Sequence, residues 1–73
     1  MKTYLTVWFN SNGFRPSQVA EKLKEIGFEP VSGAYDFVYE WDVKPRVNDV
    51  LELGDLVQKS LKSMRVLFKM ETI

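Results

Sequence analysis

Two stretches, TYLTVWF at residues 3–9 and YDFVYEW at residues 35–41, alternate along the chain with a period of two residues. Both are rich in aromatic and β-branched side chains, which favour strands over helices. Alternation of this kind predicts β-strands with one face against a core and the other facing outward. These two strands anchor the interpretation of the rest of the chain.

Helices are expected after each of these strands. Pro16 suits the first turn of a helix because it lacks an N–H that would need a partner there, and Gly27 is a suitable stop. A second helix is expected to begin at Lys44-Pro45. Its expected apolar stripe consists of Val47, Val50, Leu51, Gly54, Val57, Leu61 and Met64.

Two further strands complete the pattern, a short one at about residues 28–32 and a last one at residues 65–73. Pro30 cannot donate to a strand ladder, so the short strand is expected at a sheet edge. The order βαββαβ then predicts a single α+β domain over residues 1–73. It has a four-stranded antiparallel sheet in the order 4-1-3-2 and two helices on one face. This arrangement resembles the ferredoxin-like plait, a fold that hosts many functions and implies none of them.

Composition argues against several classes of function. The 73 residues include no cysteine and no histidine, which excludes thiol nucleophiles, imidazole bases and Cys/His metal sites. Ten basic and ten acidic residues cancel, so attraction to nucleic acid or to a membrane surface is weak. Asp36 and Glu40 stand about 13 Å apart on one strand face, too far to share an ion. We therefore expect a cytoplasmic, non-enzymatic protein without a metal or cofactor.

The strand at residues 35–41 allows two orientations. In the favoured one, Tyr35, Phe37, Tyr39 and Trp41 face the helices, while Asp36, Val38 and Glu40 face outward, because burying unpaired carboxylates is costly. Gly54 supports this orientation, since a glycine within a helix could permit close approach to large rings.

In the other orientation the aromatics lie on the open face. Thr3-Tyr4-Leu5 and Tyr35-Asp36-Phe37-Val38 then resemble the motifs of the RNA recognition motif family. That resemblance implies that Tyr4, Tyr35 and Phe37 stack on RNA bases. A small-molecule-binding regulatory domain is a further alternative.

The favoured orientation places four apolar side chains on neighbouring strands of the face that no helix covers. They are Tyr4, Trp8, Val38 and Leu67. A contiguous exposed apolar surface marks a contact site. We therefore predict a protein-interaction module that forms a homodimer or binds another protein through this face. Packing of open faces is preferred to pairing of the last strand's edge, because Lys69 and Glu71 guard that edge.

Overall fold

The computed structural model describes all residues from 1 to 73. Its six elements follow one another as β1 (Lys2–Trp8), α1 (Pro16–Ile26), β2 (Glu29–Pro30), β3 (Phe37–Glu40), α2 (Val47–Ser63) and β4 (Leu67–Thr72). The predicted order of strands and helices is therefore confirmed. The strands β2 and β3 are shorter than predicted, and α2 begins two residues after Pro45.

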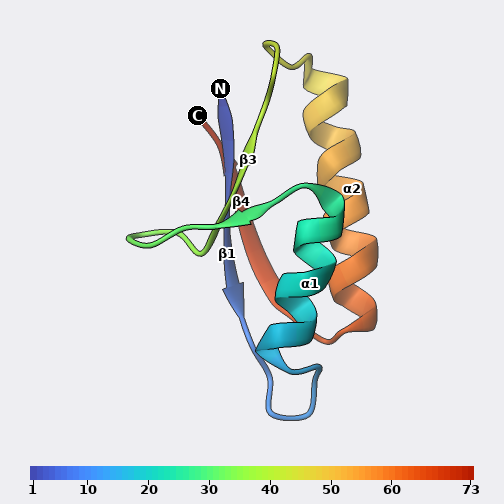
Figure 1. The fold of residues 1–73 in the computed structure, drawn as a ribbon. Helices are drawn as coiled ribbons and strands as arrows, with labels where there is room; N and C mark the ends of the chain where they lie inside the picture. Colours follow the sequence, from blue (N-terminus) through green and yellow to red (C-terminus); the bar gives the residue numbers. More distant parts are fainter.

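The four strands form one antiparallel sheet in the order β2-β3-β1-β4 (Figure 1). Read from the opposite edge, this order is 4-1-3-2, so each strand has the neighbours that were expected. β1 is central and pairs with β3 and with β4, whereas the two-residue β2 forms one edge. β4 forms the other edge, and it is the only long strand with a free side.

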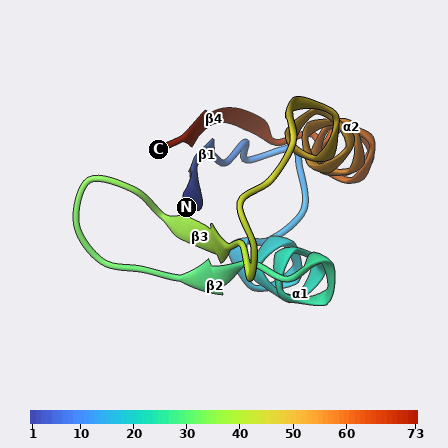
Figure 2. The ribbon, with the colours of Figure 1, turned by 90° about the horizontal axis from the view of Figure 1, so that it is seen from above.

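Both helices lie on the same side of the sheet (Figure 2). The core between the two layers consists of ten buried apolar residues: Leu5, Val7, Val19, Leu23, Phe28, Phe37, Leu53, Val57, Leu61 and Val66. No helix covers the opposite side of the sheet, which we call the open face. Along β1 the even-numbered residues from Lys2 to Trp8 lie on this face, because the odd-numbered ones are buried.

The first helix follows its sequence signals closely. It begins at Pro16 and ends before Gly27, whose φ of 123° lies in the region that glycine alone adopts easily. The Gly27 N–H donates to the carbonyls of Leu23 and Lys24, which closes the last turn.

The second helix is rotated relative to the predicted stripe. Val47 and Leu51 are 76% and 60% exposed, so their assignment to the buried stripe is wrong. Leu53 and Ser60 are buried instead, on the same stripe as Val57 and Leu61. Both stripes have helical spacing, and the sequence favoured the more apolar one.

The segment at residues 35–41, which contains β3, shows the favoured orientation for three of its four aromatics. Phe37 is buried, and Tyr39 and Trp41 pack against the core. The assignment of Tyr35 is wrong. Asp36 ends the ladder, because its N–H donates to the Leu5 carbonyl and its carboxylate accepts from the N–H of Val7. The chain therefore turns away before Phe37, and Tyr35 lies over the open face.

Gly54 was expected to permit close approach of a helix to an aromatic ring, but Gly27 is the glycine that does so. A β-carbon on Gly54 would lie 3.2 Å from the terminal methyl of Met70, on β4, and near no ring. A β-carbon on Gly27 would lie 2.8 Å from Cε2 of Tyr39. The glycine that lets an aromatic of the third strand approach a helix is thus the one that ends α1.

Candidate functional site

The sheet register places the four predicted site residues on the open face as two cross-strand pairs. Tyr4 lies opposite Val38, and Trp8 lies opposite Leu67. Tyr4 and Trp8 are four residues apart on β1, which separates the two pairs by about 13 Å along the strand. Thr6 fills the interval. The four residues therefore share one face but do not form one continuous apolar surface.

Tyr35 covers the Tyr4 ring of the first pair. Its ring stacks on that of Tyr4, with centroids 4.5 Å apart and planes 23° apart. Its hydroxyl donates a hydrogen bond to Oε2 of Glu71 on β4, at 3.0 Å. The loop that leads from β2 to β3 is thereby tied across β1 to the far edge strand. The sequence gives no sign of this arrangement, because Tyr35 continues the alternating pattern of the strand.

Glu71 links this tyrosine to a cation. Its Oε1 lies 3.0 Å from Nζ of Lys69, two residues earlier on the same face of β4. The Lys69 ammonium, followed by the Tyr35 hydroxyl, holds the pKa of the Glu71 carboxyl below its usual value. The hydrogen bond to Glu71 in turn raises the pKa of the Tyr35 phenol. The middle of the open face is therefore polar and internally paired.

The second pair remains accessible. Trp8 is 52% exposed and Leu67 is 74% exposed, although the two side chains are direct cross-strand neighbours. We call these two residues the Trp8–Leu67 patch. It reaches the free edge of the sheet, because Leu67 belongs to β4. A further exposed apolar side chain lies at the other end of the β1–β4 pair: Ile73, which is 64% exposed and paired with Lys2 of β1.

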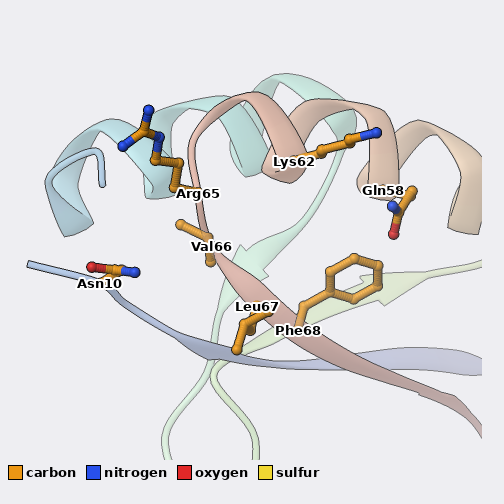
Figure 3. Close-up of a pocket in the computed structure, with 7 residues that line it drawn as sticks. All are labelled: Asn10, Gln58, Lys62, Arg65, Val66, Leu67 and Phe68. Atoms are coloured by element: carbon orange, nitrogen blue, oxygen red, sulfur yellow. The ribbon is translucent and has the colours of Figure 1, made fainter. Parts of the chain in front are cut away.

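A groove lies beside the same edge, between β4 and α2 (Figure 3). Its volume is about 540 Å³, and it is lined by Asn10, Gln58, Lys62, Arg65, Val66, Leu67 and Phe68. Figure 3 shows the Phe68 ring directed from β4 toward Gln58 of α2. Neither Lys62 nor Arg65 forms a salt bridge. Gln58 and Lys62 are four residues apart, about one helical turn, and this spacing in the sequence indicates that they lie on the same flank of α2.

The backbone of β4 presents free hydrogen-bonding groups at this edge. Lys2 and Ile73 exchange both of their backbone hydrogen bonds, at 3.1 and 2.9 Å. Such exchanges recur at every second residue of an antiparallel pair. The N–H and C=O groups of the alternate residues Phe68, Met70 and Thr72 therefore point away from β1.

Buried polar contacts brace the other end of the β1–β4 pair. Thr3 is fully buried, and its Oγ1 accepts a hydrogen bond from Nε1 of Trp41 at 2.8 Å. The same hydroxyl lies 2.8 Å from Oγ1 of Thr72. Nothing in the sequence distinguishes Thr3, because threonine that alternates with apolar residues is ordinary in a strand.

The stacking arrangement implied by the RNA recognition motif is not present. Phe37 is only 7% exposed and faces the helices, so it cannot meet a base on the open face. Tyr4 and Tyr35 stack on each other instead. The two carboxylates of the segment at residues 35–41 are held separately: Asp36 accepts from the N–H of Val7, and Glu40 lies 3.3 Å from Nζ of Lys2, its cross-strand neighbour on β1.

Comparison with known proteins gives no relative: no family model, no curated protein and no solved structure matches this chain. Neither α1 nor α2 combines the length and apolar character that a helix needs to cross a bilayer.

Proposed function

We propose that this chain is a non-enzymatic interaction module with the architecture of a ferredoxin-like plait, and that it associates with a second copy of itself. The observation that carries the proposal is the Trp8–Leu67 patch. A tryptophan and a leucine lie side by side at the edge of a sheet, on a face without helices, and more than half of each side chain is exposed. Tryptophan at the centre of an interface is a frequent source of binding energy.

The size of the domain supports association. Ten apolar residues are buried in a chain of 73, which leaves little core to stabilise the fold. A partner that binds only the folded chain stabilises it, and this stabilisation grows with the logarithm of the partner's concentration once the concentration exceeds the Kd. Self-association through the patch would therefore stabilise the domain as well as give it a function.

The test is a comparison of the wild-type chain with Trp8→Lys. The wild type should sediment as a dimer and melt at a temperature that rises with protein concentration. Trp8→Lys should give a folded monomer whose lower melting temperature does not depend on concentration.

Leu56→Lys is the matched control. Leu56 is 46% exposed, close to the exposure of Trp8, but it lies on α2 and away from the open face. This variant should remain a dimer. Equal loss of association in both variants would show that the patch has no special role, and a wild type that is monomeric throughout would contradict the proposal.

A further inference from the structure

We propose that the second copy adds to the free edge of β4, so that two antiparallel β4 strands pair about a two-fold axis at Met70 and the two sheets become one. This inference rests on the proposed self-association and specifies its geometry. It replaces the packing of open faces that the sequence favoured. The occupant of the edge is a second copy of this chain, and the reason is that β4 is complementary to itself.

The backbone of β4 can accept a strand in this position. Phe68, Met70 and Thr72 direct their N–H and C=O groups outward, as the Lys2–Ile73 exchange establishes. In a pairing centred on Met70, each copy's Met70 faces its equivalent, and Phe68 faces Thr72 of the second copy. All of these outward groups then find partners. The opposite edge of the sheet offers only two residues, one of them Pro30, and could not serve in the same way.

The side chains on the open face match in the same register. Lys69 lies opposite Glu71 of the second copy, and the two-fold axis repeats this pair with the roles exchanged. Opposite charges that face each other across neighbouring strands attract. The existing Lys69–Glu71 salt bridge at 3.0 Å would extend into a ring of four alternating charges. Lys69 and Glu71, whose charges disfavour pairing with other strands, therefore favour pairing with a second copy of β4.

Other registers lack this match. A pairing centred on Lys69 or on Glu71 places like charges directly opposite each other, which is destabilising. A pairing centred on Phe68 extends the contact toward Arg65, whose φ of 59° breaks the extended chain, and toward Val66, whose N–H already donates to Leu61.

The Met70 register also extends the Trp8–Leu67 patch. It sets Leu67 opposite Ile73 of the second copy, and these side chains are 74% and 64% exposed in the single chain. Leu67 would then lie between Trp8 on one side and the second copy's Ile73 on the other. Trp8 would thus act through Leu67, and Trp8→Lys would weaken the pairing by placing an ammonium group beside the buried Leu67–Ile73 contact. The apolar surface of the open face, which is split within one copy, becomes continuous across two.

The helix layer offers a second contact. A two-fold axis perpendicular to the sheet keeps the helices of both copies on one side, and it brings the second α2 toward the flank of α2 above the groove. That flank carries Gln58 and Lys62, which line the groove. Val47 and Leu51 continue the same stripe at helical spacing and are 76% and 60% exposed. Contact with the second α2 would cover these two side chains.

Charge exchange tests the register. Lys69→Glu and Glu71→Lys should each give a chain that is monomeric at a concentration at which the wild type is a dimer, because each variant places like charges opposite each other. Mixed in equal amounts, the two variants should form a heterodimer, since they carry opposite charges at both positions. The readout is the sedimentation mass of each sample. Circular dichroism checks that each variant is folded.

Glu40→Lys is the control for this experiment. Glu40 lies on the open face of β3, far from the β4 edge, and pairs only with Lys2. Edge pairing predicts that this variant stays a dimer. If it dissociates while Lys69→Glu does not, face packing holds and edge pairing is wrong. If both edge variants are monomeric and their mixture also stays monomeric, the Met70 register is wrong. A monomeric wild type would instead overturn the proposed function itself.

Cross-linking tests the same register directly, and the chain contains no cysteine to interfere. A chain with both Leu67→Cys and Ile73→Cys should oxidise to a disulfide-linked dimer, because these residues oppose each other at a non-hydrogen-bonded position, where Cα atoms lie about 4.5 Å apart. Six residues, about 20 Å of strand, prevent a bond within one chain. Either substitution alone should give no rapid cross-link. A double variant that stays monomeric on a non-reducing gel, under conditions where the wild type is a dimer, would overturn the edge pairing.

Discussion

The Tyr35 hydroxyl donates a hydrogen bond to Glu71 Oε2 at 3.0 Å, and so joins the loop before β3 to the far edge strand. The ring of Tyr35 lies on that of Tyr4 as it crosses β1. This contact divides the open face into a covered part and an exposed part. Leu67 and Trp8 remain accessible at the other end of the β1–β4 pair.

The contribution of this contact to stability should depend on pH in both directions. Lys69 and the Tyr35 hydroxyl hold the pKa of Glu71 below its usual value, so the stabilisation is present above about pH 4.3 and is lost as the pH falls through the lowered value. The pKa of Tyr35 is raised by its bond to Glu71, so the stabilisation is complete below about pH 10 and disappears as the pH rises through the raised value.

The measurement is an NMR titration of the Glu71 carboxyl and the Tyr35 ring, with Tyr35→Phe as the control. This substitution keeps a ring that can stack on Tyr4 and removes the donor. It should move the Glu71 pKa upward, toward the ordinary glutamate value. An unchanged Glu71 pKa in the Phe variant would show that the hydrogen bond does not form in solution.

The orientation of β3 predicts unequal effects for two adjacent residues. Phe37 is 7% exposed and lies in the core, so Phe37→Ala should lower the free energy of unfolding by about 3–5 kcal/mol. Val38 lies on the open face, so Val38→Thr should change the free energy of unfolding little. Urea unfolding measures both. A severe loss from Val38→Thr with a mild loss from Phe37→Ala would contradict the assigned orientation.

Replacing Thr3 by an apolar residue of equal size should lower the free energy of unfolding. Thr3→Val keeps the shape of the side chain but removes the acceptor of the Trp41 indole N–H and the partner of the Thr72 hydroxyl. The expected cost is about 1–3 kcal/mol of unfolding free energy, because two polar groups lose their partner. Thr6→Val, on the open face of the same strand, is the control and should be nearly neutral. Equal effects at both positions would contradict the role of the buried hydroxyl.

Alanine should have opposite effects at two glycines. At Gly54 it replaces a poor helix former and meets only the mobile methyl of Met70 at 3.2 Å, so the free energy of unfolding should rise by up to about 1 kcal/mol. At Gly27 it meets the Tyr39 ring at 2.8 Å and must adopt a φ of 123°, so it should lower that free energy by about 1–3 kcal/mol. A loss at Gly54 would show that Met70 cannot move aside.

The sequence predicts those features that local chemistry controls. Pro16 and Gly27 bound α1 because their backbone preferences act within a few residues. Pro30 places β2 at an edge for the same reason. Alternation correctly assigns the buried faces of β1 and β4, since a strand has only two faces and one of them is clearly more apolar.

The sequence-based predictions are wrong where contacts with residues distant in sequence determine the position of a side chain. Tyr35 extends the pattern of its strand, but the bonds of Asp36 to Leu5 and Val7, some thirty positions away, end the ladder before it. Val47 and Leu51 have the spacing of a core stripe, yet the rotation of α2 against the sheet places them outside. The complementarity of β4 with itself emerges only when the sheet order shows which of its backbone groups are free.

The measurement that tests self-association most directly is sedimentation equilibrium of the wild-type chain over a range of concentrations. The account predicts a reversible dimer of twice the 8.5 kDa chain mass, whose fraction rises with concentration. A constant mass of 8.5 kDa up to about 1 mM, which limits any association to a free energy weaker than about −4 kcal/mol, would contradict it.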